Sequence, residues 1–505
     1  MPPTNNEYQI TNNRRAPVAR LNWQRAAETF TTRQMSAKQS IGRDAAGWLL
    51  VVALFYSPWD YGGTGASAIR NLNWILGAAF FVWLIGRLFG RSSKEEGSER
   101  TGISDPGYNK SWVLLAVSVL LLLIGWGMAL NAHFISDADY WISLPLTSPL
   151  PNAPGSVDYA LSIAWMWRAT ALLGCVWVVA DLIQDKQWLL RIWWAIGLAG
   201  GSIALFGLLQ KATGADMIFW EHLERGETPV STFFATYYYH GNAGAFLNLS
   251  YPAILGLAWR YVTRRANPVA RALWLTLALI MSVAVASDTS RMGQSIAVAM
   301  VLVLLVFSLE KVFRKVRHLE WKTVLFALLA GGVALWAIVQ TSQIDRSLGR
   351  WDRFQSTWTR DARWLVDRVA LDALPEAGAV GFGPGTFSVV FPHLQLKAPA
   401  GAQGSWLFLH NDYLQTLLEW GWVGGLLWGV VLFGGMGVAL WSLMHRSRSA
   451  NWSPRQRVLL ALALVALGGV ALHAAVDFPL QISSIQLFAA TWLGVCWGAG
   501  RWPTG

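Results

Sequence analysis

The sequence has few charged side chains. Asp, Glu, Lys and Arg make up 14% of the 505 residues and hydrophobic residues make up 54%, whereas an ordinary soluble protein has roughly 25% charged residues. Several windows are almost free of charge over about 20 residues, the length that an α-helix needs to cross a bilayer. The composition excludes an ordinary soluble domain and predicts an all-α, polytopic integral membrane protein.

Other absences narrow the function. Cys175 and Cys496 both lie within apolar runs, so we expect no disulfide framework. There is no Walker loop for a nucleotide, and the scattered histidines lack metal-ligand spacing. We therefore expect no cofactor and no metal. The net charge of +11 does not predict nucleic-acid binding, because Lys and Arg fall mostly between apolar runs, which is typical of topology signals.

The apolar runs and basic loops alternate consistently along the chain. They predict about 12 transmembrane helices with both termini cytoplasmic and no internal repeat of the transporter kind. Residues 1–44 form a polar, basic, disordered cytoplasmic tail without a signal peptide, 45–342 hold spans one to nine, 343–410 form a long outer loop, and 411–505 hold spans ten to twelve. The predicted spans are 45–58, 71–90, 112–131, 160–181, 189–210, 233–259, one ending near 286, 292–309, 323–341, 413–443, 457–475 and 483–500.

The long outer loop is unusual because it is basic. Apolar positions between Trp358 and Leu374 predict an amphipathic helix lying on the membrane. Arg360 and Arg363 lie one turn apart on it, and guanidinium groups match phosphate geometry. The alternative is a solvated or headgroup-binding face, with Arg363 paired to Asp367 at i+4.

His410 stands where this loop meets span ten. Asn411 or Asp412 can cap the helix that follows, and its positive end favours a neutral imidazole that acts as a base and also attracts an anion. The alternative is a polar interface histidine with a structural hydrogen bond. Glu419 lies two turns further on, on the same face as Asp412, and an intramembrane carboxylate is functional or paired.

Further polar residues lie at the outer ends of other spans. Arg291 opens span eight and is either a ligand for an anion or a snorkelling interface arginine. His240 and Asn242 must face protein or a polar cavity, as must Arg168 in span four. The turn from Gly381 to Phe387, with Gly383 and Gly385, lets backbone approach a ligand or simply closes a tight loop. His473 and Asp477 are spaced to hydrogen-bond to each other in a structural role.

One motif resembles a known family. His410-Asn411, nine residues, Gly421, two residues and Gly424 resemble the signature of the O-antigen ligase family, whose relatives include O-antigen polymerases and O-oligosaccharyltransferases. The number of spans, the 381–387 turn, Ser290-Arg291 and the His473–Asp477 pair agree with it. The resemblance covers roughly residues 220–500.

The resemblance implies a metal-independent, inverting glycosyltransferase of GT-C type in the bacterial inner membrane, with its site facing the periplasm. The donor would be an undecaprenyl-diphosphate-linked glycan, and the acceptor lipid A-core or another hydroxyl, in lipopolysaccharide or surface-polysaccharide assembly. His410 would deprotonate the acceptor and Arg291 would bind the diphosphate. Arg225 is the only candidate for a further family arginine, since the usual run before span six is absent. A polymerase of the same superfamily and a lipid-linked glycan flippase are the alternatives.

Overall fold

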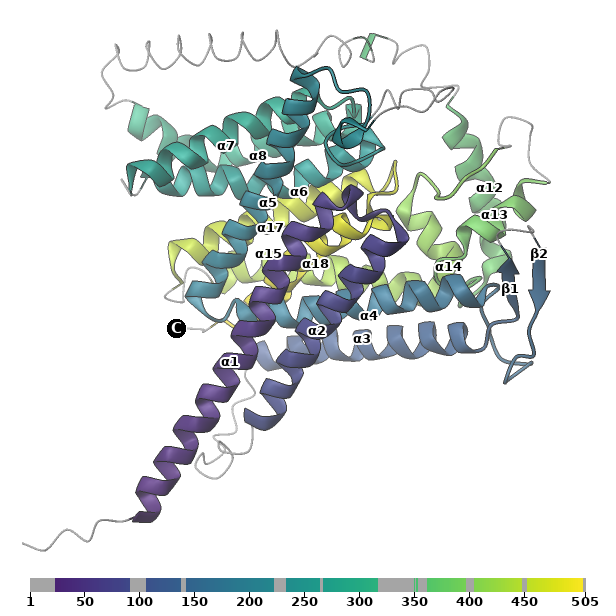
Figure 1. The fold of residues 1–505 in the computed structure, drawn as a ribbon, viewed down its shortest axis with the longest axis horizontal. Coiled ribbons are helices and arrows are strands. Elements are labelled where there is room, and N and C mark those ends of the chain that lie inside the picture. Colours follow the sequence, from purple (N-terminus) through teal and green to yellow (C-terminus); the bar gives the residue numbers. More distant parts are fainter. Residues whose placement is uncertain are drawn as a thin grey trace, which may run out of the picture.

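The structure is a computed structural model, and it is helical apart from one short hairpin (Figure 1). It describes residues 23–90, 106–137, 142–221, 233–263, 267–316, 349, 351–352, 361–396, 404–446 and 452–502. The predicted ninth span at 323–341 lies outside these residues, and so do Arg225 and Arg360.

The elements follow the predicted order of apolar runs. The first half of the chain forms α1 (Trp23–Trp59), η1 (Tyr61–Gly63), α2 (Ala66–Gly90), α3 (Pro106–Leu130), β1 (Phe134–Asp137), β2 (Ile142–Pro145), α4 (Tyr159–Leu182), α5 (Lys186–Ala212), η2 (Ile218–Trp220) and α6 (His240–Thr263). The second half forms α7 (Pro268–Ser287), α8 (Arg291–Val316), α12 (Ala362–Ala377), α13 (Phe387–Gln395), α14 (Asp412–Gly429), η5 (Val430–Gly434), α15 (Gly435–Trp441), η6 (Ser442–Arg446), α17 (Pro454–His473), η7 (Pro479–Gln481) and α18 (Ser483–Ala499).

Seven of the described helices are long and apolar enough to cross a membrane. They are Ala66–Leu88, Trp112–Leu130, Tyr159–Leu182, Lys186–Ala212, Pro268–Ser287, Asp412–His445 and Pro454–His473. The run from α14 through η6 is one continuous apolar span, in agreement with the predicted tenth. The chain is thus a multi-pass membrane protein, while the count of 12 spans stays a prediction.

Two helices form the centre of the bundle. Every residue of α18 is buried, and α6 is buried along most of its length, as expected for helices surrounded by other helices. The indole nitrogen of Trp492 in α18 donates to the carbonyl of Leu249 in α6 at 2.9 Å. His240 and Asn242 therefore face protein, as the sequence predicts, since both are at least nine-tenths buried.

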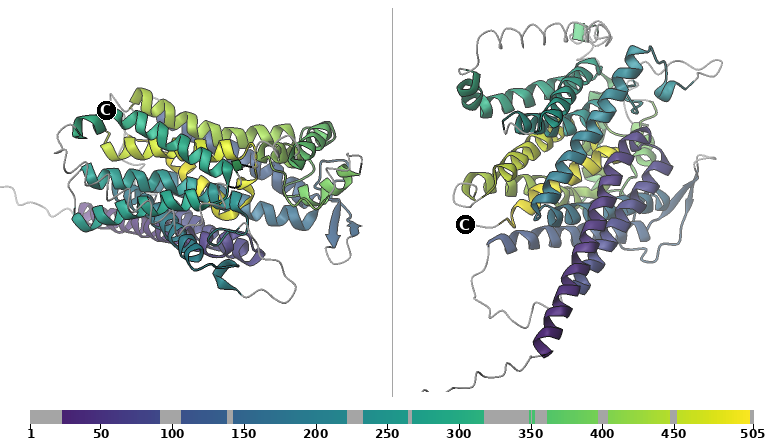
Figure 2. Two further views of the ribbon diagram at one scale, coloured as in Figure 1. Left: turned by 90° about the horizontal axis from the view of Figure 1, so that it is seen from above. Right: turned by 60° about the vertical axis from the view of Figure 1, so that its left-hand side comes forward.

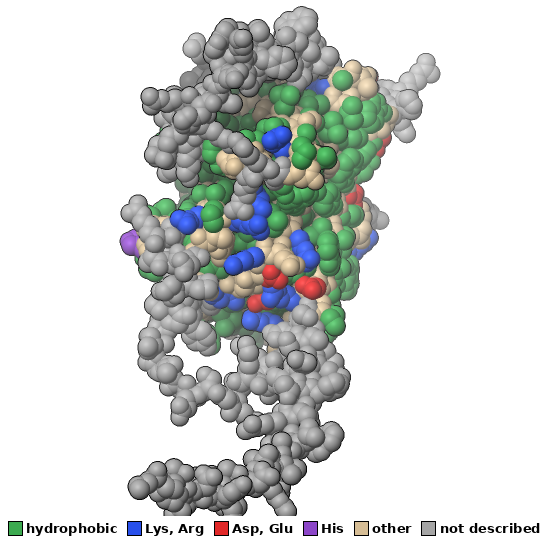
Figure 3. Space-filling view, turned by 90° about the vertical axis from the view of Figure 1, so that its left-hand side faces the viewer, with side chains coloured by type: hydrophobic (Ala, Val, Ile, Leu, Met, Phe, Trp, Pro, Cys, Tyr) green, Lys and Arg blue, Asp and Glu red, His purple; other side chains and the backbone are tan. Residues whose placement is uncertain are grey.

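One end of the bundle is basic. Lys and Arg side chains gather there among a few acidic ones (Figure 3). Arg43 lies 3.3 Å from Asp185, and Arg87 lies 3.3 Å from Asp181, so the middle of α1 and the end of α2 lie beside the α4–α5 turn. These contacts bring together segments that the sequence predicts on one side of the membrane.

The opposite end holds the parts of the long loop that the structure describes. There α12, α13 and the β1–β2 hairpin lie together (Figure 2), with β1 and β2 antiparallel and Phe134 opposite Pro145. A second apolar cluster fixes the loop to α14, and its members are Val366, Ala370, Ala373, Leu374, Ala377, Phe387, Phe391, Leu409 and Leu418. This small core holds the loop over the start of α14.

Three expectations about these elements were wrong. Helix α1 begins at Trp23, so the described part of the tail is helical rather than disordered. The sixth span begins at His240 and not near residue 233, because Phe234 and Tyr237 pair their backbones in a tight turn. In α12 two positions of the predicted apolar stripe lie off the packed face, since Trp364 is 44% and Leu371 is 50% exposed, whereas Leu365, Val369 and Leu374 of the same stripe pack in the loop cluster.

Candidate functional site: a histidine–aspartate pair at the start of helix α14

The start of α14 is fixed by its capping residues. The side chain of Asn411 accepts the backbone N–H groups of Tyr413 and Leu414 at 3.2 Å, so Asn411 is the N-cap. The buried carboxylate of Asp412 accepts the Leu480 N–H at 2.8 Å and the Gln481 amide at 2.9 Å. Asp412 therefore joins α14 to η7 and acts as a structural anchor at this end.

His410 lies just before this cap and meets Asp477, which follows α17. His410 Nδ1 is 2.8 Å from Asp477 Oδ1, and His473 Nε2 is 3.8 Å from Asp477 Oδ2. Burial by itself raises the pKa of Asp477, but the His410 hydrogen bond and the nearby cationic groups lower it to about 2. An ionised Asp477 holds the proton of His410 on Nδ1, which leaves Nε2 as an acceptor.

Tyr239 connects this pair to the long loop. Its hydroxyl donates to Asp477 Oδ2 at 2.9 Å and accepts from Arg363 Nη2 at 2.9 Å. Burial and the charge of Asp477 raise the pKa of Tyr239, so it remains a phenol. Arg363, Tyr239, Asp477 and His410 thus form one chain of hydrogen bonds from α12 to the imidazole.

Aromatic rings surround the imidazole of His410. Phe478 packs edge-on at a centroid distance of 4.8 Å and Trp406 at 5.7 Å, with Tyr239 at 6.2 Å. The ring is only partly enclosed, because 13% of its side-chain surface remains exposed. A base held in this way keeps its orientation and remains accessible to a substrate.

Of the remaining predicted residues, some belong to the His410 network and others form a separate contact around Glu419. Arg363 joins the His410 network, and its other contact is Asp361 at 3.8 Å instead of the expected Asp367. The start of α6 touches the same network, since a Cβ on Gly241 would lie 2.4 Å from Asp477 Oδ2.

Arg291 lies close to this start of α6. It is the first residue of α8, and the next turn of α8 packs on α6, where Asn248 Nδ2 donates to the Gly293 carbonyl at 2.8 Å. Gly293 also meets Gly244, which lies one turn into α6. Arg291, His240 and Asn242 therefore belong to the same end of the bundle as His410.

The glycine turn and Glu419 form a separate, structural contact. The Glu419 carboxylate accepts the Gly385 N–H at 3.1 Å, the Phe387 N–H at 3.2 Å and the Gln415 amide at 3.0 Å. Gly383 lies against Ser156. The turn therefore approaches protein, and Glu419 pairs with backbone groups of this turn.

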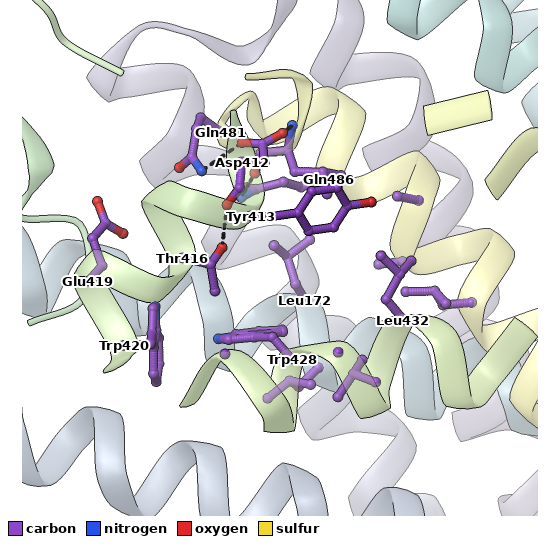
Figure 4. Close-up of a pocket in the computed structure, with 18 of the residues that line it drawn as sticks. Leu172, Asp412, Tyr413, Thr416, Glu419, Trp420, Trp428, Leu432, Gln481 and Gln486 are labelled. Carbon is purple, nitrogen blue, oxygen red and sulfur yellow. Dashed lines mark hydrogen bonds between the residues drawn. The ribbon is translucent and has the colours of Figure 1, made fainter. Parts of the chain in front are cut away.

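A largely apolar cavity of about 320 Å³ lies on another side of α14 (Figure 4). Asp412, Glu419 and Gln481 form its polar part, and Trp428 and Leu432 belong to its apolar walls. The other lining side chains come mainly from α4, α14 and α18. Arg168, on α4, donates to the Gln481 carbonyl at 3.0 Å and faces protein as predicted. The cavity combines a hydrocarbon-like interior with a polar end.

Sequence reasoning missed two members of the network. Asp477 was assigned only a structural bond to His473, and Tyr239 was assigned no role. The spacing of His473 and Asp477 hides the closer bond between Asp477 and His410, which spans 67 residues of sequence. The signal that was present is a carboxylate at the predicted outer end of a span, where a partner for His410 is needed.

Among the described residues, no group of three or more His, Cys, Asp and Glu is placed to hold a metal ion.

The fold and the site together define a multi-pass helical membrane protein with a buried His–Asp pair where a loop enters a span. Residues 275–429 match the family model described as O-antigen ligase, which confirms the resemblance predicted from His410, Gly421 and Gly424. The match supports a membrane enzyme of the O-antigen ligase and polymerase superfamily. It contains Arg291 and Arg363 but ends before Asp477. A comparison with curated proteins finds no match.

Proposed function

We propose that the protein is a membrane glycosyltransferase that moves a glycan from an undecaprenyl-diphosphate carrier to an acceptor hydroxyl on the periplasmic face. The observation that carries the proposal is the bond of 2.8 Å between His410 Nδ1 and Asp477 within a site that joins the family-matched segment to α17. Only a histidine held in this tautomer presents Nε2 as a base.

The reaction follows from this placement. The acceptor hydroxyl gives its proton to His410 Nε2, and its oxygen forms a bond to the anomeric carbon as the bond from that carbon to the diphosphate oxygen breaks. Attack opposite the leaving group inverts the configuration. Ionised Asp477 stabilises the imidazolium that forms, as in other His–carboxylate pairs.

Arginine residues complete the proposal on the leaving-group side. Arg291 begins α8 near the start of α6 and is assigned to the diphosphate, with Arg363 and the predicted Arg225 and Arg360 as further ligands. Guanidinium groups bind phosphate oxygens through two parallel hydrogen bonds. Such groups stabilise the negative charge that develops on the diphosphate as it leaves.

The apolar cavity beside α14 supports a lipid-linked donor. Its volume of about 320 Å³ and its apolar walls suit part of a polyprenyl chain. The flippase alternative places substrate ligands along a path through the membrane, whereas His410, Arg291 and Arg363 lie at one end of the bundle. A polymerase would use the same residues and differ only in its acceptor.

Glycan transfer in proteoliposomes tests the proposal. We expect wild-type protein to transfer glycan from an undecaprenyl-diphosphate donor onto lipid A-core, and His410→Ala to lose at least about 100-fold in rate. Arg291→Lys should also lose most activity, since lysine lacks the guanidinium fork. Arg271→Lys, on the predicted cytoplasmic side, is the matched control.

The products separate the alternatives. Lengthening of the donor glycan without transfer to lipid A-core would identify a polymerase. Movement of labelled lipid-linked glycan across the bilayer, equal in wild type and His410→Ala and without transfer, would reject the glycosyltransferase and support the flippase.

A further inference from the structure

An aromatic cluster forms where η1, η2 and the turn before α6 meet. The rings of Tyr61 and Tyr238 stack almost parallel, with centroids 5.8 Å apart and planes inclined by 8°. Phe219 packs edge-on against Tyr61 at 5.2 Å. Phe206 joins the cluster to Trp220 at 5.6 Å. Residues far apart in sequence thus assemble one aromatic surface, which we call the tyrosine platform (Tyr61, Phe219, Trp220 and Tyr238).

The backbone of this platform is strained. Among the described residues, the non-glycine positions with positive φ are Tyr61 at 48°, Phe219 at 54°, Trp220 at 57° and Ala235 at 53°. Three of them belong to the platform, and Ala235 lies in the turn just before Tyr238. Left-handed backbone is unfavourable for such side chains and is found preferentially at functional sites. The concentration of this strain at exposed rings points to a functional surface.

The platform is accessible and carries polar groups at its edge. Trp220 is 42% and Tyr238 is 40% exposed. The Tyr61 hydroxyl donates to the Glu221 carboxylate, and that hydrogen bond raises the pKa of Tyr61 to about 12. Trp220 Nε1 donates to Thr213 Oγ1 at 2.8 Å. Exposed aromatic faces bordered by a carboxylate and hydroxyls offer both apolar contact and hydrogen bonds.

The platform is continuous with the candidate site. Tyr238 is followed directly by Tyr239, whose hydroxyl donates to Asp477 at 2.9 Å. Tyr237, on the other side, is buried and lies 2.9 Å from Ser484 Oγ through its hydroxyl. Of three consecutive tyrosines, Tyr237 is thus anchored in the bundle, Tyr238 lies at the surface and Tyr239 reaches the His410 pair. A ligand on the platform would lie against the same short segment that contacts this pair.

We propose that the tyrosine platform is a saccharide-binding subsite that holds pyranose rings of the glycan near His410. A pyranose ring presents a face of C–H groups, whose slight positive charge is attracted to the negative face of an aromatic ring. Its hydroxyls donate to carboxylates such as Glu221. The proposal rests on the proposed function for the origin of the glycan, but the binding itself requires no transfer reaction.

An interfacial aromatic belt is the competing explanation, because Trp and Tyr collect at membrane surfaces. A belt needs neither parallel stacked rings nor a carboxylate bonded to one of them. It also gives no reason for left-handed backbone at successive ring-bearing residues. The stacking, the polar edge and the strain together favour a ligand-binding surface.

Equilibrium binding to the full-length protein in lipid nanodiscs tests the platform. The probe is the fluorescently labelled glycan that mild acid releases from the lipid-linked pool of the source bacterium. Tyr238→Leu and Trp220→Leu should each weaken binding by about tenfold, the equivalent of one stacking contact. Tyr238→Phe retains the ring and should bind within about twofold of wild type.

Two controls separate the possible outcomes. Trp74→Leu replaces an indole that is 74% exposed on α2 and should bind like wild type. His410→Ala should also bind like wild type, so binding without transfer would separate the platform from the proposed function. Unchanged binding in Tyr238→Leu and Trp220→Leu, equal weakening in Trp74→Leu, or no wild-type binding would each overturn the platform, even if transfer is observed.

Discussion

At the scale of single residues, Asp477 determines what His410 can do. The carboxylate receives hydrogen bonds from His410 and Tyr239 and lies 3.8 Å from His473. Its pKa is lowered to about 2 by the His410 hydrogen bond and by the charges around it, so it is ionised at neutral pH. A buried carboxylate that receives several donors is an orienting group as well as a charge.

Replacement of Asp477 by Asn tests this role. The amide is similar in size but can present its N–H₂ to Nδ1, which favours the tautomer with the proton on Nε2. We expect the transfer rate to fall by about 100- to 10,000-fold while donor binding changes little. Tyr239→Phe removes one hydrogen bond and keeps the ring, so it should cost only about tenfold. Equal activity of Asp477→Asn and wild type would contradict the orienting role.

Asp367 on α12 provides a pH test of folding. Burial raises its pKa to about 6, and within the described residues its Oδ1 has no hydrogen-bond partner. A raised carboxyl pKa contributes stability that is fully present below the unfolded value and is lost as pH rises through about 6. Asp367→Asn should therefore raise the melting temperature at pH 8 by about 2 °C and change it little at pH 4.

Thermal unfolding in detergent at both pH values measures this difference. Asp372→Asn replaces an exposed carboxyl group on the same helix and is the matched control. An increase in melting temperature for Asp367→Asn that is equal at the two pH values would rule out titration as the cause.

At the scale of elements, the kink in α14 allows the long loop to pack against it. Gly421 has φ of 62°, and a Cβ there would lie 2.3 Å from the carbonyl carbon of Ala379. The Phe382 and Gly383 N–H groups donate to the Leu418 and Glu419 carbonyls at 2.9 Å. Gly421 of the family signature therefore serves a loop-to-helix contact.

Gly421→Ala should disturb this contact. The added methyl group meets backbone and requires a left-handed conformation, so we expect a loss of more than about 1 kcal/mol in stability and a reduced transfer rate. Gly437→Ala is the matched control, because Gly437 lies in α15 and a Cβ there has nothing within 4 Å. Stability of Gly421→Ala equal to that of Gly437→Ala would show that the kink does not hold the loop.

At the scale of the whole molecule, the arrangement of ends agrees with the charge pattern. Paired Arg and Asp residues from α1, α2, α4 and α5 meet at one end, and α12, α13 and the hairpin meet at the other. Buried α6 and α18 connect these ends through the centre. The two ends of the bundle therefore differ, as a membrane enzyme with a site on one surface requires.

Reporter fusions test the predicted topology. Alkaline phosphatase inserted within residues 397–403 should be active, because the loop is expected in the periplasm. A fluorescent protein after Gly505 should be fluorescent, because the carboxyl terminus is expected in the cytoplasm. Activity of alkaline phosphatase at Gly505 would contradict an even number of spans.

The sequence by itself determined the class of fold and most of the helices, and it singled out His410 as the candidate base. Apolar runs must be helical in a bilayer, since every backbone group has to be satisfied internally, and the cap at Asn411 is encoded by adjacent residues. Packing between distant segments was not encoded locally. The buried face of α12 depended on which surface α13 and α14 offered, and it includes Leu374 of the predicted stripe and Val366 and Ala370 outside it, while Trp364 and Leu371 remain exposed.

Only the tertiary structure decided the partners of His410. Asp477 and Tyr239 reach it from α17 and from the turn before α6, and local spacing paired Asp477 with His473 instead. Only the tertiary structure likewise decided the partners of Glu419, because its carboxylate accepts hydrogen bonds from the Gly385 and Phe387 N–H groups, which lie over 30 residues earlier in the sequence. Hydrogen bonds between distant segments depend on how whole helices pack. The spacing of residues along the sequence does not show which distant segments come into contact.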